Sequence, residues 1–163
     1  MKVLIRQSRN DDLENIYNLH IECFKQNDCW YKSAIGNHLN SGIVIEYENN
    51  IIGVLLQGNI SICSPDEIYE SINDDGNVFE KDIIRFGIVM ICIHPNFRKK
   101  GLAKKLINKH FIINKNKLLC LFTRRSNINA YQLYKNMGYK HIAFIKNKYF
   151  LPDEDAILMV KDN

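Results

Sequence analysis

Hydrophobic residues recur along this chain with two alternating periods, one typical of strands and the other typical of helices. Residues 2–7 alternate between apolar and polar side chains, which predicts a first strand. The apolar positions that follow recur at helical spacing and predict one buried helix face, formed by Leu13, Ile16, Tyr17, His20 and Phe24. The preceding Asn10-Asp11-Asp12 supplies side chains suited to cap that helix. We expect His20 at the helix surface or the core edge, not in a ligand site.

The next segments predict a short helix and, further on, a long polar connection. The helix covers residues 29–39 and carries the only tryptophan near its start. We expect Trp30 and Tyr31 in the core or at its rim. The acidic stretch 58–81 is too long for a hairpin turn, and one helical turn is expected within it at residues 66–72.

The remaining pattern predicts a mixed α/β fold. Strands over 43–47 and 51–57 flank Glu48-Asn49-Asn50, a hairpin signal because Asn readily adopts a positive φ. Towards the C-terminus the pattern predicts strands over 118–123, 141–145 and 156–160, and a helix over 127–137 that ends at Gly138. With a further strand at 88–93 and the helix after it, the order is β-α-α-β-β-β-α-β-α-β-β. Such an order favours one sheet with helices on both faces.

Length and composition are those of one globular domain, with 163 residues, of which 46% are hydrophobic and 25% charged. No stretch approaches the roughly 20 apolar residues that a membrane span requires. Residues 1–6 become polar too soon for a signal peptide. We therefore expect a single domain over residues 1–163, no membrane partner, and a location in the cytoplasm or the nucleus. The sequence leaves the oligomeric state open.

Cysteines and charge narrow the choice of ligand. The five cysteines, which form no C-x-x-C pair, are Cys23, Cys29, Cys63, Cys92 and Cys120. We expect reduced core residues and no metal site. The formal net charge of +4 is modest, and the cations gather at 98–105 and 146–148. An anionic cofactor explains the first group with fewer assumptions than a nucleic acid does.

The stretch 88–110 predicts a buried strand, a turn and a helix. The run 88–93 is short, apolar and β-branched, and it ends at His94-Pro95, where proline disfavours a helix before it. Three consecutive cations at 98–100 then precede Gly101, where a helical pattern begins. Because a helix N-terminus has unpaired N–H groups and the positive end of the macrodipole, this turn suits a phosphate group. The pattern is neither a P-loop nor a dinucleotide fingerprint.

Three motifs in the second half of the chain point to a known family. Arg98-Lys-Lys-Gly-Leu-Ala103 fits Arg/Gln-x-x-Gly-x-Gly/Ala, and the run from Asn127 to Tyr139 fits Asn-x-x-Ala-x-x-x-Tyr-x-x-x-Gly-Phe/Tyr. Residues 148–159 fit an ending of two aromatics followed by an acidic-Asp-Ala-x-x-Met run. In these motifs the chain resembles the GNAT superfamily of N-acetyltransferases, most of all the ribosomal-protein alanine and protein N-terminal acetyltransferases. The resemblance covers about residues 82–160.

The resemblance implies a central, mostly antiparallel twisted sheet of about seven strands, whose fourth and fifth strands splay apart around the pantetheine arm of acetyl-CoA. It implies that main-chain groups of Ile91, Cys92 and Ile93 bind that arm. The implied pyrophosphate site consists of Arg98, Lys99, Lys100, Gly101, Leu102, Ala103 and Lys104. Asn127 is expected near the thioester and can cap its helix at the same time.

The reaction implied by the resemblance is direct attack of an amine on the thioester, in a ternary complex and without a covalent enzyme intermediate. An N–H group near residues 91–93 would stabilise the oxyanion. Tyr134 is the expected general acid for the leaving thiolate, a core aromatic being the alternative. The expected substrate-binding residues are Trp30, Tyr31, Phe86, Phe122 and Tyr149. Of these, Trp30-Tyr31 would face a loop at 146–150 across the acceptor site.

The general base of the resembled branch has no counterpart, because Phe86 and Phe122 stand at its positions. At pH 7, deprotonating an α-amine costs about 1 to 1.5 kcal/mol and a lysine amine about 4 to 5 kcal/mol. We therefore expect a protein or peptide N-terminal amine as the acceptor. A small amine remains open, either a polyamine or an amino-sugar phosphate held by Arg85 or Arg124. A non-catalytic acyl-CoA-binding protein is the third reading.

Overall fold

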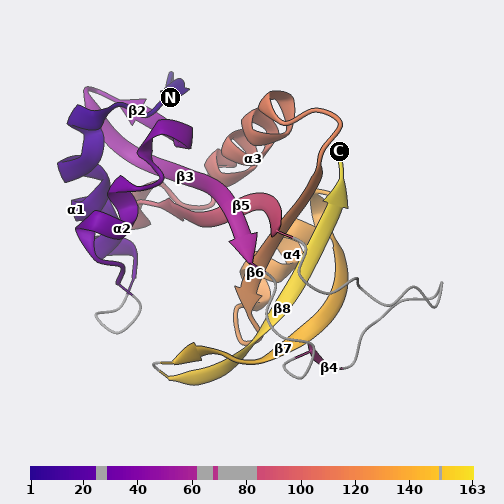
Figure 1. The fold of residues 1–163 in the computed structure, drawn as a ribbon. Coiled ribbons are helices and arrows are strands. Elements are labelled where there is room, and N and C mark those ends of the chain that lie inside the picture. The colour runs from indigo at the N-terminus through magenta and orange to yellow at the C-terminus, as the bar shows by residue number, and fades with distance from the viewer. Residues whose placement is uncertain (25–28, 62–67, 70–83, 151) are drawn as a thin grey trace. The chain divides into compact units, whose positions relative to one another are not determined.

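The fold follows the predicted order of elements, with one short strand added. The computed structural model describes residues 1–24, 29–61, 68–69, 84–150 and 152–163 (Figure 1). The strands in these ranges are β1 (Leu4–Gln7), β2 (Ile43–Tyr47), β3 (Asn50–Ser61), β4 (Ile68–Tyr69), β5 (Ile84–Ile93), β6 (Leu118–Arg124), β7 (Lys140–Phe150) and β8 (Asp153–Asp162). The α-helices are α1 (Leu13–Cys23), α2 (Lys32–Gly36), α3 (Leu102–Ile113) and α4 (Ile128–Asn136). The predicted mixed α/β class is confirmed.

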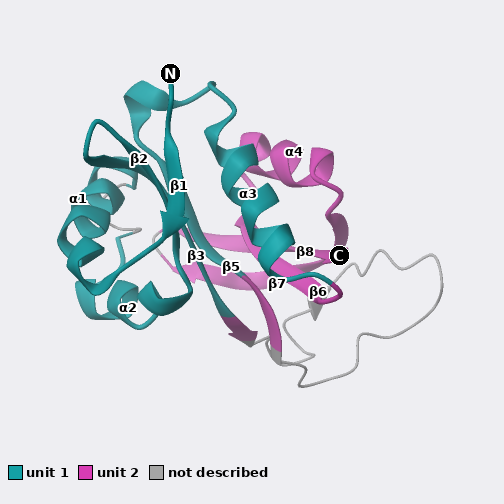
Figure 2. Ribbon diagram, turned by 90° about the horizontal axis from the view of Figure 1, so that it is seen from above, with its two compact units in different colours: residues 1–58, 88–115 teal, residues 59–87, 116–163 magenta. Residues whose placement is uncertain are grey.

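The chain forms two compact units, each assembled from two segments. Unit 1 holds residues 1–58 and 88–115, and unit 2 holds residues 59–87 and 116–163 (Figure 2). Hydrogen-bonded strands follow the order β1-β2-β3-β5 in unit 1 and β6-β8-β7-β4 in unit 2. No helix in the described ranges is long and apolar enough to cross a membrane.

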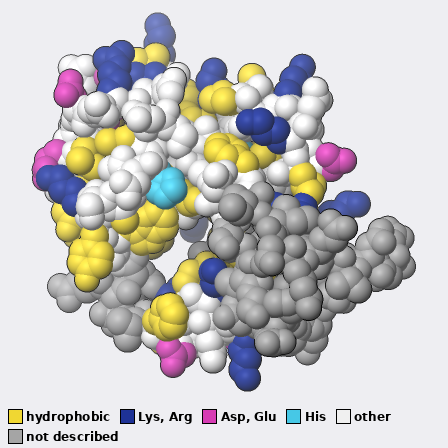
Figure 3. Space-filling model, in the orientation of Figure 1, with side chains coloured by type: hydrophobic (Ala, Val, Ile, Leu, Met, Phe, Trp, Pro, Cys, Tyr) yellow, Lys and Arg dark blue, Asp and Glu magenta, His cyan; other side chains and the backbone are white. Residues whose placement is uncertain are grey.

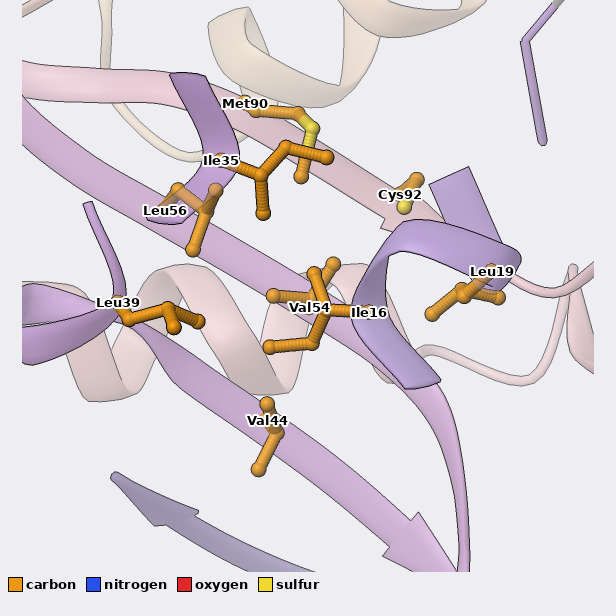
Figure 4. Close-up of a cluster of buried hydrophobic side chains, with 9 residues drawn as sticks. All are labelled: Ile16, Leu19, Ile35, Leu39, Val44, Val54, Leu56, Met90 and Cys92. Atoms are coloured by element: carbon orange, nitrogen blue, oxygen red, sulfur yellow. The ribbon is translucent and has the colours of Figure 1, made fainter. Parts of the chain in front are cut away.

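The β2–β3 hairpin organises unit 1. Its turn residues, Glu48 and Asn49, have φ values of 49° and 62°, as a tight hairpin turn requires. Val44 and Val54 are paired across the hairpin and face the core that α1 and α2 cover (Figure 4). Because side chains alternate along a strand, Ile43 points to the opposite face, where α3 packs on β2 (Figure 2). Unit 1 therefore has helices on both faces of its strands, as predicted.

A buried amide network holds the C-terminal end of α3 on β3. The Oε1 atom of Gln57 accepts a hydrogen bond from Nδ2 of Asn114 at 2.9 Å and lies 2.5 Å from Nδ1 of His110. All three side chains are buried. A buried polar group is costly unless it is hydrogen-bonded, so this set of partners fixes the position of α3 along the strand.

The start of α1 differs from the predicted capping arrangement. Asp12 makes no cap bond to α1, and its carboxylate instead accepts hydrogen bonds from the Arg6 guanidinium at 2.7 and 2.9 Å. It also accepts one from the Arg9 N–H at 2.7 Å. These bonds, led by those from Arg6, lower the pKa of Asp12. Glu46 of β2 accepts a bond from Nε of the same guanidinium at 2.9 Å, so the ion pairs tie the first strand to the second.

His20 and the second helix also correct the sequence reading. His20 is only 1% exposed, and its Nε2 accepts a hydrogen bond from the Trp30 N–H at 2.7 Å. The expected position at the helix surface or the core edge is therefore wrong. The predicted helix over 29–39 is shorter in the structure, where α2 covers only residues 32–36. The N–H of Trp30 donates to His20 of α1 and is therefore not part of a helix.

Unit 2 centres on the long β7–β8 pair. Residues 146–150, expected as a loop, belong to β7, whose pairing with β8 shifts between Ile145 and Tyr149. Within this bulge Asn147 has a φ of 49°, and its N–H donates to the Asp155 carboxylate at 3.0 Å. The helical turn expected at 66–72 is wrong at Ile68–Tyr69, which form β4 and pair with β7. The rest of that prediction lies outside the described residues.

Four of the five cysteines lie in described ranges, and all four are free thiols. Cys92 and Cys120 are buried, whereas Cys23 and Cys29 are half-buried. Burial raises the pKa of Cys120 to about 12. The expected core position is confirmed for Cys92 and Cys120 but is wrong for Cys23 and Cys29, and Cys63 lies outside the described residues.

Candidate functional site

The turn between β5 and α3, in unit 1, is the first candidate region. A 3₁₀ turn at Pro95–Phe97 follows β5, and α3 begins after Gly101, whose φ is 74°. Lys99 also has a positive φ, at 60°, which is uncommon for a residue with a side chain. Backbone turned in this way is typical of concave anion-binding sites. A Cβ atom at Gly101 would meet nothing within 4 Å, so the space beside this glycine is open.

The basic turn, residues 98–104, combines two sources of positive potential. The N–H groups of the first α3 turn have no partner within the helix, as at every helix start. Arg98, Lys99 and Lys100 are all exposed and add three cations beside those groups. Leu102, by contrast, is buried, with 3% of its surface exposed, and anchors the helix start in the core. The arrangement provides donors, field and space for a bound pyrophosphate.

Side chains from three elements hold the basic turn in place. His94 accepts a hydrogen bond from the Asn96 N–H through Nδ1 at 3.2 Å and contacts Glu22 of α1 through Nε2 at 2.9 Å. The centroids of the Phe97 and Tyr47 rings are 5.7 Å apart. Nζ of Lys100 lies 5.1 Å from the centroid of the Phe97 ring. None of these contacts follows from a motif, because each joins residues by tertiary packing.

The predicted main-chain contacts lie at the end of β5. Ile91 is half-buried, and Cys92 and Ile93 are buried. The Ile93 carbonyl already accepts hydrogen bonds from Cys23 Sγ at 3.3 Å and from Arg98 Nε at 3.1 Å. Pantetheine binding by these three residues stays a prediction, and the Ile93 carbonyl is its least available group.

The tyrosine cluster of unit 2, which consists of Tyr134, Tyr139 and Tyr149, is a second candidate region. The Tyr134 ring packs edge-on against that of Tyr139, with centroids 5.8 Å apart. Burial, and to a smaller extent the neighbouring Tyr149, raises the pKa of Tyr134 well above its usual range. Among the described residues no hydrogen-bond partner is found for the Tyr134 hydroxyl. This phenol is therefore protonated at neutral pH, the form from which a general acid donates, and its raised pKa makes it a weaker acid than an exposed tyrosine.

Arg124 supports the tyrosine cluster. Its guanidinium lies 4.3 Å from the centroid of the Tyr149 ring and donates to the Glu154 carboxylate at 3.1 Å. Glu154 also accepts a hydrogen bond from the Ser126 N–H at 2.5 Å, just before α4. Arg124 already pairs with Glu154, and the phosphate-binding role considered for it above stays a prediction. Glu154 was missed by sequence reasoning, although its place in the acidic closing motif was the available signal.

The two phenylalanines at the expected base positions both lie under lysines. Nζ of Lys117 is 5.0 Å from the centroid of Phe86, and Nζ of Lys148 is 4.8 Å from that of Phe122. Both rings are half-buried. At each of these positions a phenylalanine ring makes a cation–π contact with a lysine, and a phenylalanine ring cannot accept a proton.

The other predicted residues are distributed between the two units. Asn127 is exposed in unit 2 and caps α4, its Oδ1 accepting from the Ala130 N–H at 3.1 Å. In unit 1, Trp30 packs against the core as expected, with its ring 5.9 Å from that of His38. Tyr31 is 85% exposed, so its expected place in the core or at its rim is wrong. In unit 2, Tyr134 packs against Tyr139, and Tyr149 lies near enough to raise the pKa of Tyr134, whereas the basic turn is assembled in unit 1. Their predicted roles remain predictions.

The distribution of charged side chains and the search for metal ligands identify no further candidate site among the described residues. On the face shown in Figure 3, Lys and Arg side chains lie at separate points between exposed hydrophobic groups, and the net charge is +4. Within the described ranges, no group of three or more His, Cys, Asp or Glu side chains is placed to hold a metal ion.

A family comparison covers the basic turn and two of the three residues of the tyrosine cluster. The model of the family described as acetyltransferase (GNAT) domain matches residues 39–141. This chain belongs to the GNAT acetyltransferase family. The matched range contains the basic turn together with Tyr134 and Tyr139.

Individual GNAT relatives agree with this assignment. The ribosomal protein bS18-alanine N-acetyltransferase of Haemophilus ducreyi is 35% identical over 77 residues, which cover 42% of this chain and 52% of that protein. The match therefore spans about half of the relative's length. Among solved structures, NAA60 of Arabidopsis thaliana in complex with acetyl-CoA has a TM-score of 0.78 at 18% identity, covering 99% of this chain and 100% of the other. Naa50 of the same plant, bound to the bisubstrate analogue CoA-Ac-MVNAL, has a TM-score of 0.74 at 15% identity over 100% of both chains. Both structures share the GNAT fold with this chain.

Proposed function

We propose that this protein is an acetyl-CoA-dependent N-acetyltransferase whose acceptor is the α-amine of a protein or peptide N-terminus. The observation that carries the first half is the open space beside Gly101, at a helix start flanked by three exposed cations. A pyrophosphate needs those N–H donors and that positive potential. Several GNAT relatives contribute to the same conclusion, since their names specify acetyl-CoA or an N-acetyltransferase.

In this proposal acetyl-CoA supplies the acetyl group as a thioester. The basic turn holds the pyrophosphate, and main-chain groups at residues 91–92 orient the arm. A neutral amine attacks the thioester carbonyl, and an N–H group of β5 stabilises the oxyanion that develops. Tyr134 then donates its proton to the departing thiolate. Burial raises the pKa of Tyr134 and so keeps this phenol protonated at neutral pH.

The choice of acceptor rests on the missing base. Phe86 and Phe122 cannot take a proton, so the enzyme depends on an amine that is already partly neutral. An α-amine, with a pKa of about 7.7–8.0, meets this condition, and a lysine amine of about 10.4 does not. Engagement of Arg124 by Glu154 removes one phosphate contact that an amino-sugar phosphate would use. The names of the bS18-alanine enzyme and the Naa50 complex, with its MVNAL peptide, favour the same acceptor class.

Release of free CoA tests the proposal. The purified chain is incubated with acetyl-CoA and one acceptor at a time: a peptide with a free N-terminus, the same peptide blocked at its N-terminus but carrying a lysine, glucosamine 6-phosphate, or spermidine. We expect turnover with the first peptide and at most slow turnover with the blocked one. Turnover with spermidine or the amino sugar alone would contradict the acceptor. Acetyl-CoA binding without turnover on any amine would instead identify a non-catalytic acyl-CoA binder.

A further inference from the structure

Two thiols meet where α1 ends and β5 approaches the basic turn. Cys23 is the last residue of α1, and Cys92 is the penultimate residue of β5. Cys23 packs against the core cluster that contains Cys92, and its Sγ lies 3.3 Å from the carbonyl oxygen of Ile93, the residue after Cys92. Cys92 is 7% exposed and belongs to the core cluster that also contains Leu19 of α1 (Figure 4). Cys23 is half-buried, so one thiol of the pair is within reach of solvent and the other is enclosed.

The thiol pair is connected directly to the basic turn. Cys23 Sγ donates to the Ile93 carbonyl at 3.3 Å, and Arg98 Nε donates to the same oxygen at 3.1 Å. Arg98 therefore lies close enough to act on Cys23 electrostatically. Any change in the position of the β5 end at Cys92 is transmitted to the residue that begins the turn.

The surroundings divide the two thiols into different chemical roles. The neighbouring Cys92 side chain and the charge of Arg98 lower the pKa of Cys23 to about 7, against the opposing effects of burial and Glu22. The pKa of Cys92 is raised, because Cys23 and burial both disfavour its thiolate. A partly exposed thiolate beside a buried thiol has the arrangement of an attacking and a resolving cysteine.

We propose that Cys23 and Cys92 form a peroxide-reactive thiol pair whose oxidation to a disulfide weakens acetyl-CoA binding at the basic turn. The effect on binding rests on the function proposed above, whereas the formation of the disulfide does not. Nothing in the family resemblance assigns a role to either sulfur.

The chemistry requires a hydroperoxide as the oxidant, for example hydrogen peroxide. The Cys23 thiolate attacks one peroxide oxygen, forming a sulfenic acid as the O–O bond breaks, and the released hydroxide takes a proton to become water. The Cys92 sulfur then attacks the Cys23 sulfur, loses its proton and expels a second water. Two thiols and one peroxide thus give one disulfide and two waters, and two electrons pass from sulfur to oxygen.

Closing the bond changes the end of β5. A disulfide holds its sulfurs about 2.05 Å apart, closer than any hydrogen-bonded contact, so Cys92 and the end of α1 must draw together. The Cys23 S–H that donates to the Ile93 carbonyl is lost at the same time. Arg98, which shares this carbonyl, then no longer has the same position relative to the cations after it.

Mass spectrometry of the full chain tests the thiol pair by itself. After treatment with an equivalent of hydrogen peroxide and blocking of free thiols, we expect a linked peptide containing Cys23 and Cys92 that dithiothreitol separates. Cys23→Ser should abolish the linked peptide, and Cys92→Ala should instead leave a sulfenic acid at Cys23 that dimedone traps. Cys29→Ser is the matched control, because Cys29 is also half-buried in unit 1, and it should leave the link intact. Absence of the linked peptide in the folded wild-type chain would overturn the proposal.

Alkylation provides a second readout that does not depend on the disulfide. The rate at Cys23 should rise with a midpoint near pH 7, and Arg98→Gln should move the midpoint upward. An unchanged midpoint in that variant would show that Arg98 does not lower the pKa of Cys23.

Calorimetry with acetyl-CoA tests the consequence. We expect the oxidised protein to bind about fivefold more weakly or worse, which corresponds to about one hydrogen bond lost, with recovery after reduction. Cys23→Ser should bind equally before and after peroxide. Equal affinity of the reduced and disulfide-linked wild type would overturn the regulatory part. If even the reduced protein bound no acetyl-CoA, the proposed function would fail, while the linked peptide would still decide the thiol chemistry.

Discussion

The basic turn of unit 1 and the tyrosine cluster of unit 2 differ in the chemical groups that they present: backbone groups in the turn and side chains in the cluster. The turn works through backbone: positive φ values at Lys99 and Gly101 and the free N–H groups of a helix start. Its cations are exposed and surround an open space. The cluster works through side chains, with a buried phenol packed against a second ring. In the proposed function, the first region binds an anion and the second holds the proton of a buried phenol.

This difference shows which kind of site tolerates change. A backbone site depends on conformation, so the residue that permits a positive φ matters more than the exact cations around it. A buried side-chain site depends on one functional group, so the loss of a single oxygen removes its chemistry while its packing survives. Substitutions in the two regions should therefore affect different kinetic constants.

The largest effect is expected for the phenol of the tyrosine cluster. Tyr134→Phe should lower kcat by about 10²- to 10⁴-fold and leave acetyl-CoA affinity nearly unchanged, because only a transition-state interaction is lost. Steady-state kinetics and calorimetry provide the two measurements. Tyr131→Phe is the control on the same helix, since its ring packs against His141 and has no assigned role. Near-wild-type turnover of Tyr134→Phe would show that water protonates the thiolate.

The basic turn should respond most strongly at its glycine. Gly101→Asp should weaken acetyl-CoA binding by about 10²-fold or more, because a carboxylate would fill the open space and repel the phosphates. Gly101→Asn is the matched variant of the same shape, and asparagine tolerates a positive φ better than most residues. It should bind at least about tenfold better than the Asp variant, since only the charge differs. Equal affinities for Asp and Asn would place the pyrophosphate elsewhere.

The pH profile separates a substrate-limited proton from an enzyme base. With no base at Phe86 or Phe122, the rising limb of kcat/KM should follow the pKa of the acceptor. It should move upward by about 2.5 pH units when an α-amine is replaced by a lysine-like amine. Profiles measured with both acceptors provide the check. A limb fixed near pH 6–7 for each of them would reveal a base in the protein.

The smallest effects are expected for one arginine in each region. Arg98→Gln should raise the Kd for acetyl-CoA about tenfold through the loss of a charge-assisted contact, with little change in acceptor KM. Arg124→Gln should do the reverse, raising acceptor KM a few-fold by loosening Tyr149 and Glu154. Kinetics over both substrates measure the two constants. The same response in both variants would show that the two regions do not bind different substrates.

Most of the secondary structure could be predicted from the sequence because it depends on residues that are close together in the chain. The hairpin at residues 48–50 and the helix ending at Gly138 both depend on which residues tolerate a positive φ, and both are confirmed. The misses are cases in which distant partners overruled a local signal. Residues 146–150 look like a loop but pair with β8, because Asp155 binds the N–H that the bulge exposes. Asp12 looks like a helix cap but binds Arg6 from the first strand.

The candidate site divides in the same way. The basic turn could be recognised from spacing alone, because a strand, a glycine and a helix start follow one another in the chain. Sequence also placed Tyr134 on its helix. It could not show that burial and Tyr149 raise its pKa, that Glu154 engages Arg124, or that Cys23 packs against the core cluster that contains Cys92. Each of these facts requires two segments far apart in sequence to meet.

The sequence by itself determined the backbone conformations, since φ preferences, caps and hydrophobic period act over a few neighbouring residues. It therefore predicted where strands and helices lie and where an anion could meet a helix start. Only the tertiary structure decided the protonation states and polar partners, because pKa and hydrogen bonding depend on burial and on charges brought together by packing. His20 illustrates the limit: its position on a helix was readable, but its burial against the Trp30 N–H was not.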